Sequence, residues 1–333
     1  MKRLFTRYKS RLRSHTGKDF SLRPAWNPKH IGDLRGQRFL VTGANSGIGY
    51  STSLELARRG ASVVLACRNP QKLEETMSSL QGSIPGALLE PLLLDLASFR
   101  SIDTAVKEEL KKELPLNVLI NNAGVMAPPK RLLTEDGYEL QFGVNVLGHF
   151  VLTQKLLPCL ESAESARVVN VASIAHRRGE LKFHDLQWEQ NYNPRQSYAQ
   201  SKLANLMFSL ELERRLRNSN SSVSSIACHP GVANTRLFTT GDYGLCERLV
   251  REIVSSLIGW VLNSQWQGSL PSLFSATSDF AKGGGYYGPQ GFREMRGGDV
   301  GIATIEPQAK KLDDSERLWN ICEELTGTKF LSG

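Results

Sequence analysis

The sequence predicts an α/β fold in which a doubly wound parallel sheet carries helices on both faces. Two observations support this prediction. Six short apolar runs alternate with helical stretches, and a glycine-rich turn follows the first run directly. The predicted strands cover residues 38–41, 62–66, 90–94, 117–120, 167–171 and 223–227, and a last strand is expected near 285–287.

The length of 333 residues is compatible with a single domain, since α/β folds of about 250 residues routinely form one. No internal repeat, low-complexity tract or Pro/Ser-rich linker divides the chain. We therefore expect an N-terminal extension over 1–35 and one folded domain over 36–333. The five cysteines are odd in number and show no C-x-x-C spacing, so neither a disulfide framework nor a metal site is expected.

The net charge of +8 resides in the N-terminal extension. Residues 1–38 hold eleven Lys/Arg against two Asp, whereas the rest of the chain holds thirty against thirty-one acidic residues. A nearly neutral domain argues against nucleic-acid binding. The leader places apolar residues on one helical face with basic residues around it, which favours peripheral membrane contact or organelle import; a solvated tail is the alternative. No apolar run reaches the ~18 residues that span a bilayer, so a cytoplasmic or peripherally membrane-associated protein is expected.

A glycine turn separates the first predicted strand from a helical pattern over 50–59. Gly43 permits a tight turn, Gly47 lets the backbone approach a pyrophosphate, and Gly49 allows helix and strand to pack closely. The helix N-terminus supplies N–H groups and a favourable dipole for phosphates. Because the spacing is G-x-x-x-G-x-G rather than G-x-G-x-x-G, a turn without a ligand remains open. The candidate cofactor-binding residues of this turn are Gly43, Asn45, Ser46, Gly47, Ile48 and Gly49.

Two later strands also end in residues suited to ligand binding. One is followed by Asn122, Ala123 and Gly124, and the other ends at Ser173. The carboxyl ends of strands are where an open parallel sheet binds its ligands. Each segment alone could be an ordinary turn between strand and helix.

Tyr198 and Lys202 are four residues apart in a helix-forming stretch that follows Ser173. Residues i and i+4 share a helix face, so the ammonium can lie beside the phenol and favour its ionised form. A tyrosine that normally titrates near pH ~10 could then act as an acid or base closer to neutrality. Taken alone, Tyr-x-x-x-Lys is also a common surface pair.

In this order the segments resemble the short-chain dehydrogenase/reductase family, whose pattern is T-G-x-x-x-G-I-G, N-N-A-G, a helix asparagine, a serine and Y-x-x-x-K. The resemblance covers roughly residues 36–240. Within the family the chain is most similar to the retinol dehydrogenase-like subgroup, on residues 145–150, 183–187, 201–205, 229–231 and 316–320. A Rossmann-type catalytic domain over 36–333 is implied.

The resemblance implies hydride transfer between a nicotinamide cofactor and a carbonyl or alcohol. Tyr198 would be the acid/base, Ser173 would hydrogen-bond the carbonyl oxygen, and Lys202 would lower the Tyr198 pKa and bind the nicotinamide ribose. Asn145 would support a water chain that resupplies protons through Lys202. The cofactor contacts implied beyond the glycine turn are Asp95, Leu96, Asn122, Ala123, Gly124, Tyr198, Lys202, Pro230, Gly231 and Thr235.

The end of the second strand favours NADP(H) over NAD(H). An NAD site usually has a carboxylate at this position for the ribose hydroxyls, whereas this chain has Cys67 followed by Arg68. A guanidinium offers charge-assisted hydrogen bonds to a 2′-phosphate.

The substrate is expected to be lipophilic, such as a retinoid, steroid, prenoid or fatty aldehyde. Residues 237–267 read as an amphipathic helical insertion over the substrate cleft, although its apolar face could instead pack on the core or on a second subunit. A homodimer through the helices that carry Asn145 and Tyr198 is also possible. His149 is expected to be packed and hydrogen-bonded, and His176 lies in a loop from which it could reach the substrate.

Two rival functions stay open at this level. One is the reduction of a carbon–carbon double bond on the same scaffold. The other is a non-enzymatic, nucleotide-binding regulator, since a fold does not determine a function. The complete set of Asn145, Ser173, Tyr198 and Lys202 argues against a pure binding module, which has no chemical need for them.

Overall fold

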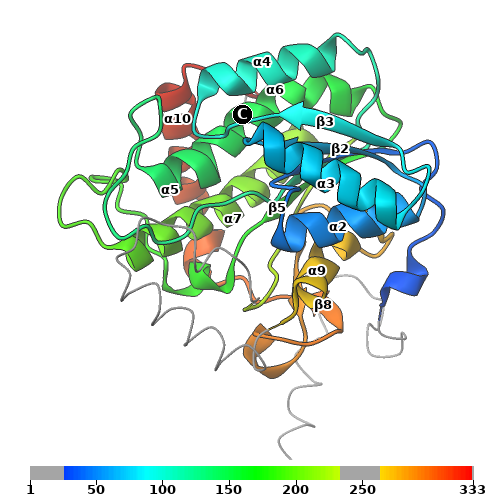
Figure 1. The fold of residues 1–333 in the computed structure, drawn as a ribbon. Helices are drawn as coiled ribbons and strands as arrows, with labels where there is room; N and C mark the ends of the chain where they lie inside the picture. The colour runs from blue at the N-terminus through cyan, green and yellow to red at the C-terminus, as the bar shows by residue number, and fades with distance from the viewer. Residues whose placement is uncertain (1–25, 233–262, 332–333) are drawn as a thin grey trace, which may run out of the picture.

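An eight-stranded sheet forms the centre of the computed structural model, which describes residues 26–232 and 263–331 (Figure 1). The strand order is β3-β2-β1-β4-β5-β6-β7-β8, and every neighbouring pair is parallel except β7 and β8. The doubly wound parallel sheet is thereby confirmed. The strands are β1 (Arg38–Thr42), β2 (Ser62–Cys67), β3 (Leu89–Leu93), β4 (Val118–Asn121), β5 (Ala166–Val171), β6 (Val223–Cys228), β7 (Tyr286–Pro289) and β8 (Val300–Ile302).

Strand β8 is the one element of the sheet that the sequence did not predict. It has three residues, contains Gly301, and leaves Ile302 exposed. Such a segment shows neither alternation nor an apolar run, the two patterns that predict strands. It is held in place by antiparallel pairing with β7, a partner that local sequence does not reveal.

The helices cover both faces of the sheet. They are α2 (Gly47–Arg58), α3 (Pro70–Ser83), α4 (Phe99–Leu110), α6 (His149–Glu161), α7 (Pro194–Asn218), α9 (Gln265–Thr277) and α10 (Leu312–Thr326). Short turns of helix lie at α5 (Leu140–Phe142), η4 (Gly143–Gly148) and η5 (Ile174–Arg178). Helix α2 begins three residues before the predicted start, because Gly47 and Gly49 hide its first turn from a propensity argument.

Side chains of alternate strand residues pack into two separate apolar cores, one on each face of the sheet. On β1, for example, Leu40 points to the core under α4, α6 and α7, while Phe39 and Val41 point to the core under α2, α3 and α9. Burial on both faces explains why the strands read as continuous apolar runs rather than alternating ones. Figure 1 shows α4 and α6 on one side of the sheet and α2 and α9 on the other.

The order of the strands reverses between β1 and β4. The chain winds from β1 to β2 and β3 in one direction, then returns to β4 and continues to β5 and β6 in the other. At such a reversal the loops after two adjacent strands diverge and leave a crevice beyond their carboxyl ends, where ligands bind. The glycine turn after β1 and the Asn122 segment after β4 meet at this position.

Several predictions concern residues beyond the described ranges. Thr235 and residues 237–262 of the predicted insertion lie outside them, as do residues 1–25 of the N-terminal extension. Residues 265–267 begin α9, which packs against α2 rather than forming part of a lid. Trp26 packs edge-on against Phe274, so the described end of the extension belongs to the apolar core. Within residues 26–232 and 263–331, no helix is long and apolar enough to cross a bilayer.

Helix α10 covers α6 and α7 within the same chain. Its Trp319 ring lies 5.0 Å from the ring centroid of Phe150 on α6 and 5.8 Å from that of Phe208 on α7. Phe330 closes the cluster at 5.0 Å from Trp319. This aromatic side of the two helices is buried in the monomer, so the homodimer prediction requires a different side of α6 and α7.

A buried ion cluster lies at the amino-terminal end of the strands, opposite the end that carries the glycine turn. The Arg38 guanidinium at the start of β1 donates to Glu90 on β3 at 2.7 Å and to Glu109 on α4 at 2.6 Å. The Arg38 and Glu109 side chains are 7% and 2% exposed. Lys112 Nζ also donates to Glu109 at 2.6 Å and to Glu90 at 2.8 Å, so the buried charges compensate one another within one cluster.

Replacement of this arginine should therefore destabilise the protein strongly. We expect Arg38→Ala to lower the free energy of unfolding by about 3 kcal/mol, the low end for a broken buried ion pair, because among the described residues the buried Glu109 carboxylate then keeps only Lys112 as a charged partner. Arg100→Ala is the matched control: its ion pair with Glu135 is exposed and should contribute only about 0–1 kcal/mol. Denaturant unfolding of both variants measures the difference, and equal effects would contradict the assignment.

Candidate active site

The turn after β1 has the backbone that its glycines allow. Gly43 and Gly47 have φ angles of 67° and 58°, a region that residues with a side chain rarely adopt. A Cβ atom on Gly49 would lie 2.3 Å from the Gly43 carbonyl oxygen. The first turn of α2 can therefore approach β1 closely, and its N–H groups have no partner within the helix. This is a cradle of the kind that holds a phosphate group.

Thr42 fixes this turn against β4. Its hydroxyl oxygen accepts hydrogen bonds from the backbone N–H groups of Asn122 and Ala123, both at 2.9 Å. The Asn122 side-chain amide in turn donates to the Thr42 carbonyl oxygen at 2.7 Å. The predicted strand ended at Val41 and Thr42 was not predicted as a site residue, although its place in the motif T-G-x-x-x-G-I-G could have identified it.

Asn145 lies in the π-helical turn η4, which precedes α6, and is fully buried. Its side-chain oxygen accepts from the Val125 N–H at 2.8 Å, and its amide donates to the Val125 carbonyl at 3.0 Å and to the Ser201 hydroxyl at 2.9 Å. Asn145 thus joins the loop after β4 to α7. π-Helical turns often occur at functional sites.

The structure brings Ser173, Tyr198 and Lys202 together beside this asparagine. Ser173 caps η5 at the end of β5 and hydrogen-bonds the Tyr198 side chain. The Lys202 ammonium donates to the Val171 carbonyl at 2.9 Å and lies 5.9 Å from the centroid of the Tyr198 ring. A Cβ atom on Gly124 would lie 3.6 Å from Lys202 Nζ and 3.3 Å from Asn145 Oδ1, so a glycine keeps this space open.

Burial dominates the titration of the two central groups. It raises the pKa of Tyr198 to about 12, although the hydrogen bond with Ser173 acts in the opposite direction. It lowers the pKa of Lys202 to about 8. Desolvation of the phenolate outweighs the effect of Ser173, so the pKa of Tyr198 lies above its ordinary value rather than closer to neutrality. At neutral pH the phenol therefore carries its proton.

The two histidines near the site are structural. His149 is buried and bridges Asn145 and Thr42, with Nδ1 3.2 Å from the Asn145 carbonyl and Nε2 3.1 Å from the Thr42 hydroxyl. Burial lowers its pKa to about 3, so the ring is neutral. His176 is also buried, with Nδ1 2.8 Å from the Ser173 carbonyl oxygen. Its side chain is fully buried and packs edge-on against the Tyr286 ring.

The predicted adenine side of the crevice lies at the ends of β2 and β3. Arg68 is exposed at the end of β2 and makes no hydrogen bond or ion pair in the described part of the chain. Asp95 accepts from the Ala97 N–H at 2.9 Å, which shapes the turn after β3. Leu96 is buried, and its carbonyl oxygen would lie 2.5 Å from a Cβ on Gly148. Since β2 and β3 follow β1 in the sheet, these residues share an edge with the glycine turn.

The predicted nicotinamide side lies after β6. Gly231 has a φ angle of 71°, and a Cβ there would lie 2.4 Å from the Met295 carbonyl oxygen. The Pro230 carbonyl accepts from the Asn263 amide at 2.9 Å. This turn is therefore held tightly against the segment that follows β7.

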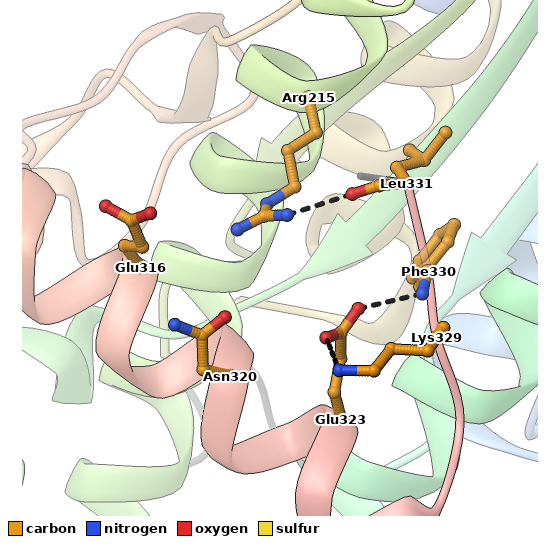
Figure 2. A pocket seen from close by; sticks show the side chains of 7 residues that line it. All are labelled: Arg215, Glu316, Asn320, Glu323, Lys329, Phe330 and Leu331. Carbon is orange, nitrogen blue, oxygen red and sulfur yellow. Dashed lines mark hydrogen bonds and ion pairs between the residues drawn. The ribbon is translucent and has the colours of Figure 1, made fainter. Parts of the chain in front are cut away.

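A separate hollow of about 470 Å³ lies between α7 and α10 (Figure 2). Arg215, one of its lining residues, lies thirteen residues beyond Lys202 on α7, or about 20 Å at 1.5 Å per residue. Figure 2 shows Arg215 bonded to the Leu331 carbonyl and Glu323 bonded to Lys329 and to the Phe330 N–H. These contacts pair Arg215, Glu323 and Lys329 within the hollow, which is not part of the site described above.

The fold and the site define a class of protein before any comparison. A doubly wound sheet with a glycine cradle at its switch point binds a dinucleotide. A half-buried phenol beside a hydroxyl and an amine can exchange a proton with a carbonyl or alcohol oxygen. A dinucleotide-dependent oxidoreductase combines these two features.

Comparison with known proteins gives the family. Residues 37–242 match the sequence profile described as short chain dehydrogenase. Retinol dehydrogenase 12 of Bos taurus is 38% identical over 300 residues, which cover 89% of this chain and 88% of that protein. Among solved structures, an uncharacterized protein from Mycobacterium paratuberculosis has a TM-score of 0.73 and 34% identity, with 92% of this chain and 99% of that chain covered. L-Sorbose reductase from Gluconobacter frateurii, solved with NADPH and L-sorbose, has a TM-score of 0.61 at 20% identity, with 77% and 95% covered.

The chain belongs to the short-chain dehydrogenase/reductase family and is retinol dehydrogenase-like. It is therefore an oxidoreductase of the alcohol–carbonyl class.

The glycine cradle gives a direct test of the cofactor site. A methyl group at position 49 would be 2.3 Å from the Gly43 carbonyl and 2.6 Å from the Asn122 amide, so α2 must move away. We expect Gly49→Ala to weaken nucleotide binding at least tenfold and to cost about 1–3 kcal/mol of stability. Gly82→Ala, in α3 with open space around it, should bind nucleotide normally. Fluorescence titration with NADPH and NADH measures both variants, and unchanged binding by Gly49→Ala would contradict the cradle.

Proposed function

We propose that the protein is an NADP(H)-dependent oxidoreductase that interconverts a lipophilic aldehyde or ketone and its alcohol, with Tyr198 as acid/base. One observation carries the proposal: Ser173, Tyr198 and Lys202 come together next to Asn145 and the Gly124 opening, at the carboxyl edge of the sheet. A nucleotide-binding regulator would need the cradle but not this group. The catalytic domain extends over 36–333.

The proton chemistry follows from the side chains. The nicotinamide, when bound, supplies or accepts the hydride. Tyr198 donates its phenolic proton to the carbonyl oxygen as negative charge develops there, and acts as the base in the reverse direction. Ser173, already hydrogen-bonded to Tyr198, donates to the same oxygen and holds it beside the phenol. With a Tyr198 pKa of about 12, the phenol is protonated at neutral pH and suited to reduction.

Lys202 acts on Tyr198 through space and on the cofactor through its amine. Its pKa of about 8 leaves it mostly cationic at neutral pH, so the charge faces a phenolate as soon as one forms. Lys202 therefore stabilises the Tyr198 phenolate once the proton has been donated, and it does not ionise the phenol beforehand. The Asn145 side chain, hydrogen-bonded to Val125 and Ser201, fixes the position of Lys202 relative to the Gly124 backbone.

The NADP(H) preference rests on Arg68. Its guanidinium is exposed at the end of β2, free of intramolecular partners within the described residues, and available for a 2′-phosphate. A bidentate, charge-assisted contact of this kind discriminates against a ribose that lacks the phosphate. The contacts proposed for Asp95, Leu96, Asn122, Ala123, Pro230, Gly231 and Thr235 complete the cofactor site.

The lipophilic substrate class is supported by the relatives, which are named for retinol. The apolar residues in the sequence of 237–262 support the same class. The basic, amphipathic leader would bring the enzyme to the membrane surface where such substrates reside.

Removal of the phenol tests the proposed chemistry. We expect Tyr198→Phe to lower carbonyl reduction about 10²–10⁴-fold, because the alkoxide then forms without a proton donor. Tyr287→Phe is the matched control, since that phenol accepts a backbone hydrogen bond from Lys282 and faces the other core. NADPH oxidation with retinal, steroid ketones, medium-chain aldehydes and a small polar ketone measures both variants. Equal turnover by wild type and Tyr198→Phe would refute the role of Tyr198.

Removal of the guanidinium tests the cofactor preference. We expect Arg68→Ala to raise the Kd for NADPH about tenfold to a hundredfold, the value of a charge-assisted contact, and to leave the Kd for NADH nearly unchanged. Arg58→Ala, at the opposite end of α2 from the glycine turn, is the control. If the Kd for NADPH did not change in Arg68→Ala, the NADP(H) assignment would be wrong.

A further inference from the structure

The segment after β7 contains two non-glycine residues in the left-handed region. Arg293 and Glu294 have φ angles of 50° and 60°. This conformation is disfavoured for residues with a Cβ and persists only where the surroundings hold it. Neither residue belongs to the family motifs on which the proposed function rests.

What holds this segment is the Glu294 carboxylate. It accepts hydrogen bonds from the Arg177 guanidinium at 2.5 Å, from the Thr304 hydroxyl at 2.6 Å and from the Thr304 N–H at 3.1 Å. The His229 ring lies on its remaining side, with Nε2 3.3 Å from the carboxylate, a long distance for a hydrogen bond. Burial alone would raise the pKa of Glu294, but these donors and the Arg177 charge lower it to about 2, so the group is ionised.

The orientation of His229 is fixed from the other side of the ring. Its Nδ1 accepts from the Gly231 N–H at 3.1 Å, which leaves the proton on Nε2, facing Glu294. Burial lowers the pKa of His229, so the ring is neutral. The carboxylate is therefore connected to the backbone of the turn that begins at Pro230.

The groups that face Glu294 come from both sides of the proposed reaction centre. Arg177 lies in η5, whose N-cap is Ser173, and His229 directly precedes Pro230. The adjacent Met295 carbonyl also accepts from the Val232 N–H at 2.7 Å. Between the two sides stands the buried Tyr286, whose hydroxyl lies 3.4 Å from both the Ser173 carbonyl and His176 Nδ1.

We propose that Glu294 is a positioning residue that sets the distance between Ser173 and the Pro230–Gly231 turn. It touches no reacting atom. It acts by holding η5 through Arg177 and the turn after β6 through His229 and the neighbouring Met295 carbonyl. The inference rests on the proposed function, in which Ser173 holds the carbonyl oxygen and the turn after β6 holds the nicotinamide. A small error in the relative position of two such groups slows a reaction many-fold.

The decisive variant is Glu294→Gln, which keeps the size of the side chain and removes its charge. Glu323→Gln is the matched control, because Glu323 also accepts from several donors: Trp319 Nε1 at 3.2 Å, the Phe330 N–H at 2.8 Å and Lys329 Nζ at 3.1 Å (Figure 2). It lies on α10, beside the far end of α7. Removal of its charge should leave turnover unchanged.

Turnover of the full chain provides the first readout. We expect Glu294→Gln to lower kcat about tenfold to a hundredfold with little change in the KM for the carbonyl. The primary deuterium isotope effect from 4-deuterated NADPH should increase, because hydride transfer becomes the slow step. A merely structural role would lower thermal stability and the amount of active protein without a change in the isotope effect. Wild-type kcat in Glu294→Gln, or a loss shared by Glu323→Gln, would overturn the proposal.

Nucleotide binding provides a second readout that needs no turnover. The nicotinamide end alone should be affected, so Glu294→Gln should weaken NADPH about threefold to tenfold and leave 2′-phospho-ADP-ribose unchanged. Equal effects on both nucleotides, or none, would contradict a role at the nicotinamide side. If wild type reduces no carbonyl, the proposed function fails, and this comparison still decides what Glu294 does.

Thr304→Val provides a second test that remains usable if the Glu294→Gln variant does not fold. It removes the 2.6 Å hydrogen bond to the carboxylate at an exposed position and keeps the shape of the side chain. We expect a smaller change in the same direction in kcat, in the isotope effect and in NADPH binding. Thr304→Ser, which keeps the hydroxyl, should restore wild-type behaviour, and identical results for the two variants would count against the proposal.

Discussion

The hydroxyl of Thr42 joins the two strands between which the sheet changes direction. It accepts two backbone N–H groups from the end of β4, and the His149 ring meets it from the other side. Because the other nitrogen of that ring contacts the Asn145 carbonyl, the same hydroxyl also orders the π-helical turn that carries the site asparagine. The cofactor cradle and the proton-transfer group are therefore fixed to one another by a short chain of buried hydrogen bonds, and a low local dielectric strengthens each of them.

Burial determines the chemistry that this framework permits. The phenol of Tyr198 and the amine of Lys202 are both driven toward their neutral forms, to pKa values of about 12 and about 8. The account we propose uses this directly: a protonated phenol donates to the carbonyl oxygen, and the neighbouring ammonium then stabilises the phenolate. A carboxylate, Glu294, stands outside the reacting group and connects the elements on either side of it. In this account the charge of Glu294 positions the neighbouring elements. The phenol of Tyr198 becomes charged only during the reaction.

Local sequence contained most of the fold and the centre of the site. Apolar runs and glycine spacing predicted seven of the eight strands and the turn after β1, because each depends on residues adjacent in the chain. What it lacked were contacts between distant segments. The pairing of β8 with β7 and the bond from Arg177 to Glu294, 117 residues apart, have no local signature. The rise in the Tyr198 pKa was not foreseen for a related reason: helical spacing shows that two groups share a face, but it says nothing of how deeply that face is buried.

The central claim is that Tyr198 donates a proton to a carbonyl oxygen, while a bound nicotinamide would supply the hydride to the carbonyl carbon. Reduction of retinal with 4-deuterated NADPH, followed by mass spectrometry of the product, tests it most directly, since retinal offers both a carbonyl and conjugated double bonds. The account predicts one deuterium on the carbinol carbon and intact double bonds. Deuterium on a chain carbon with the aldehyde retained would show a carbon–carbon double-bond reductase and would contradict the account.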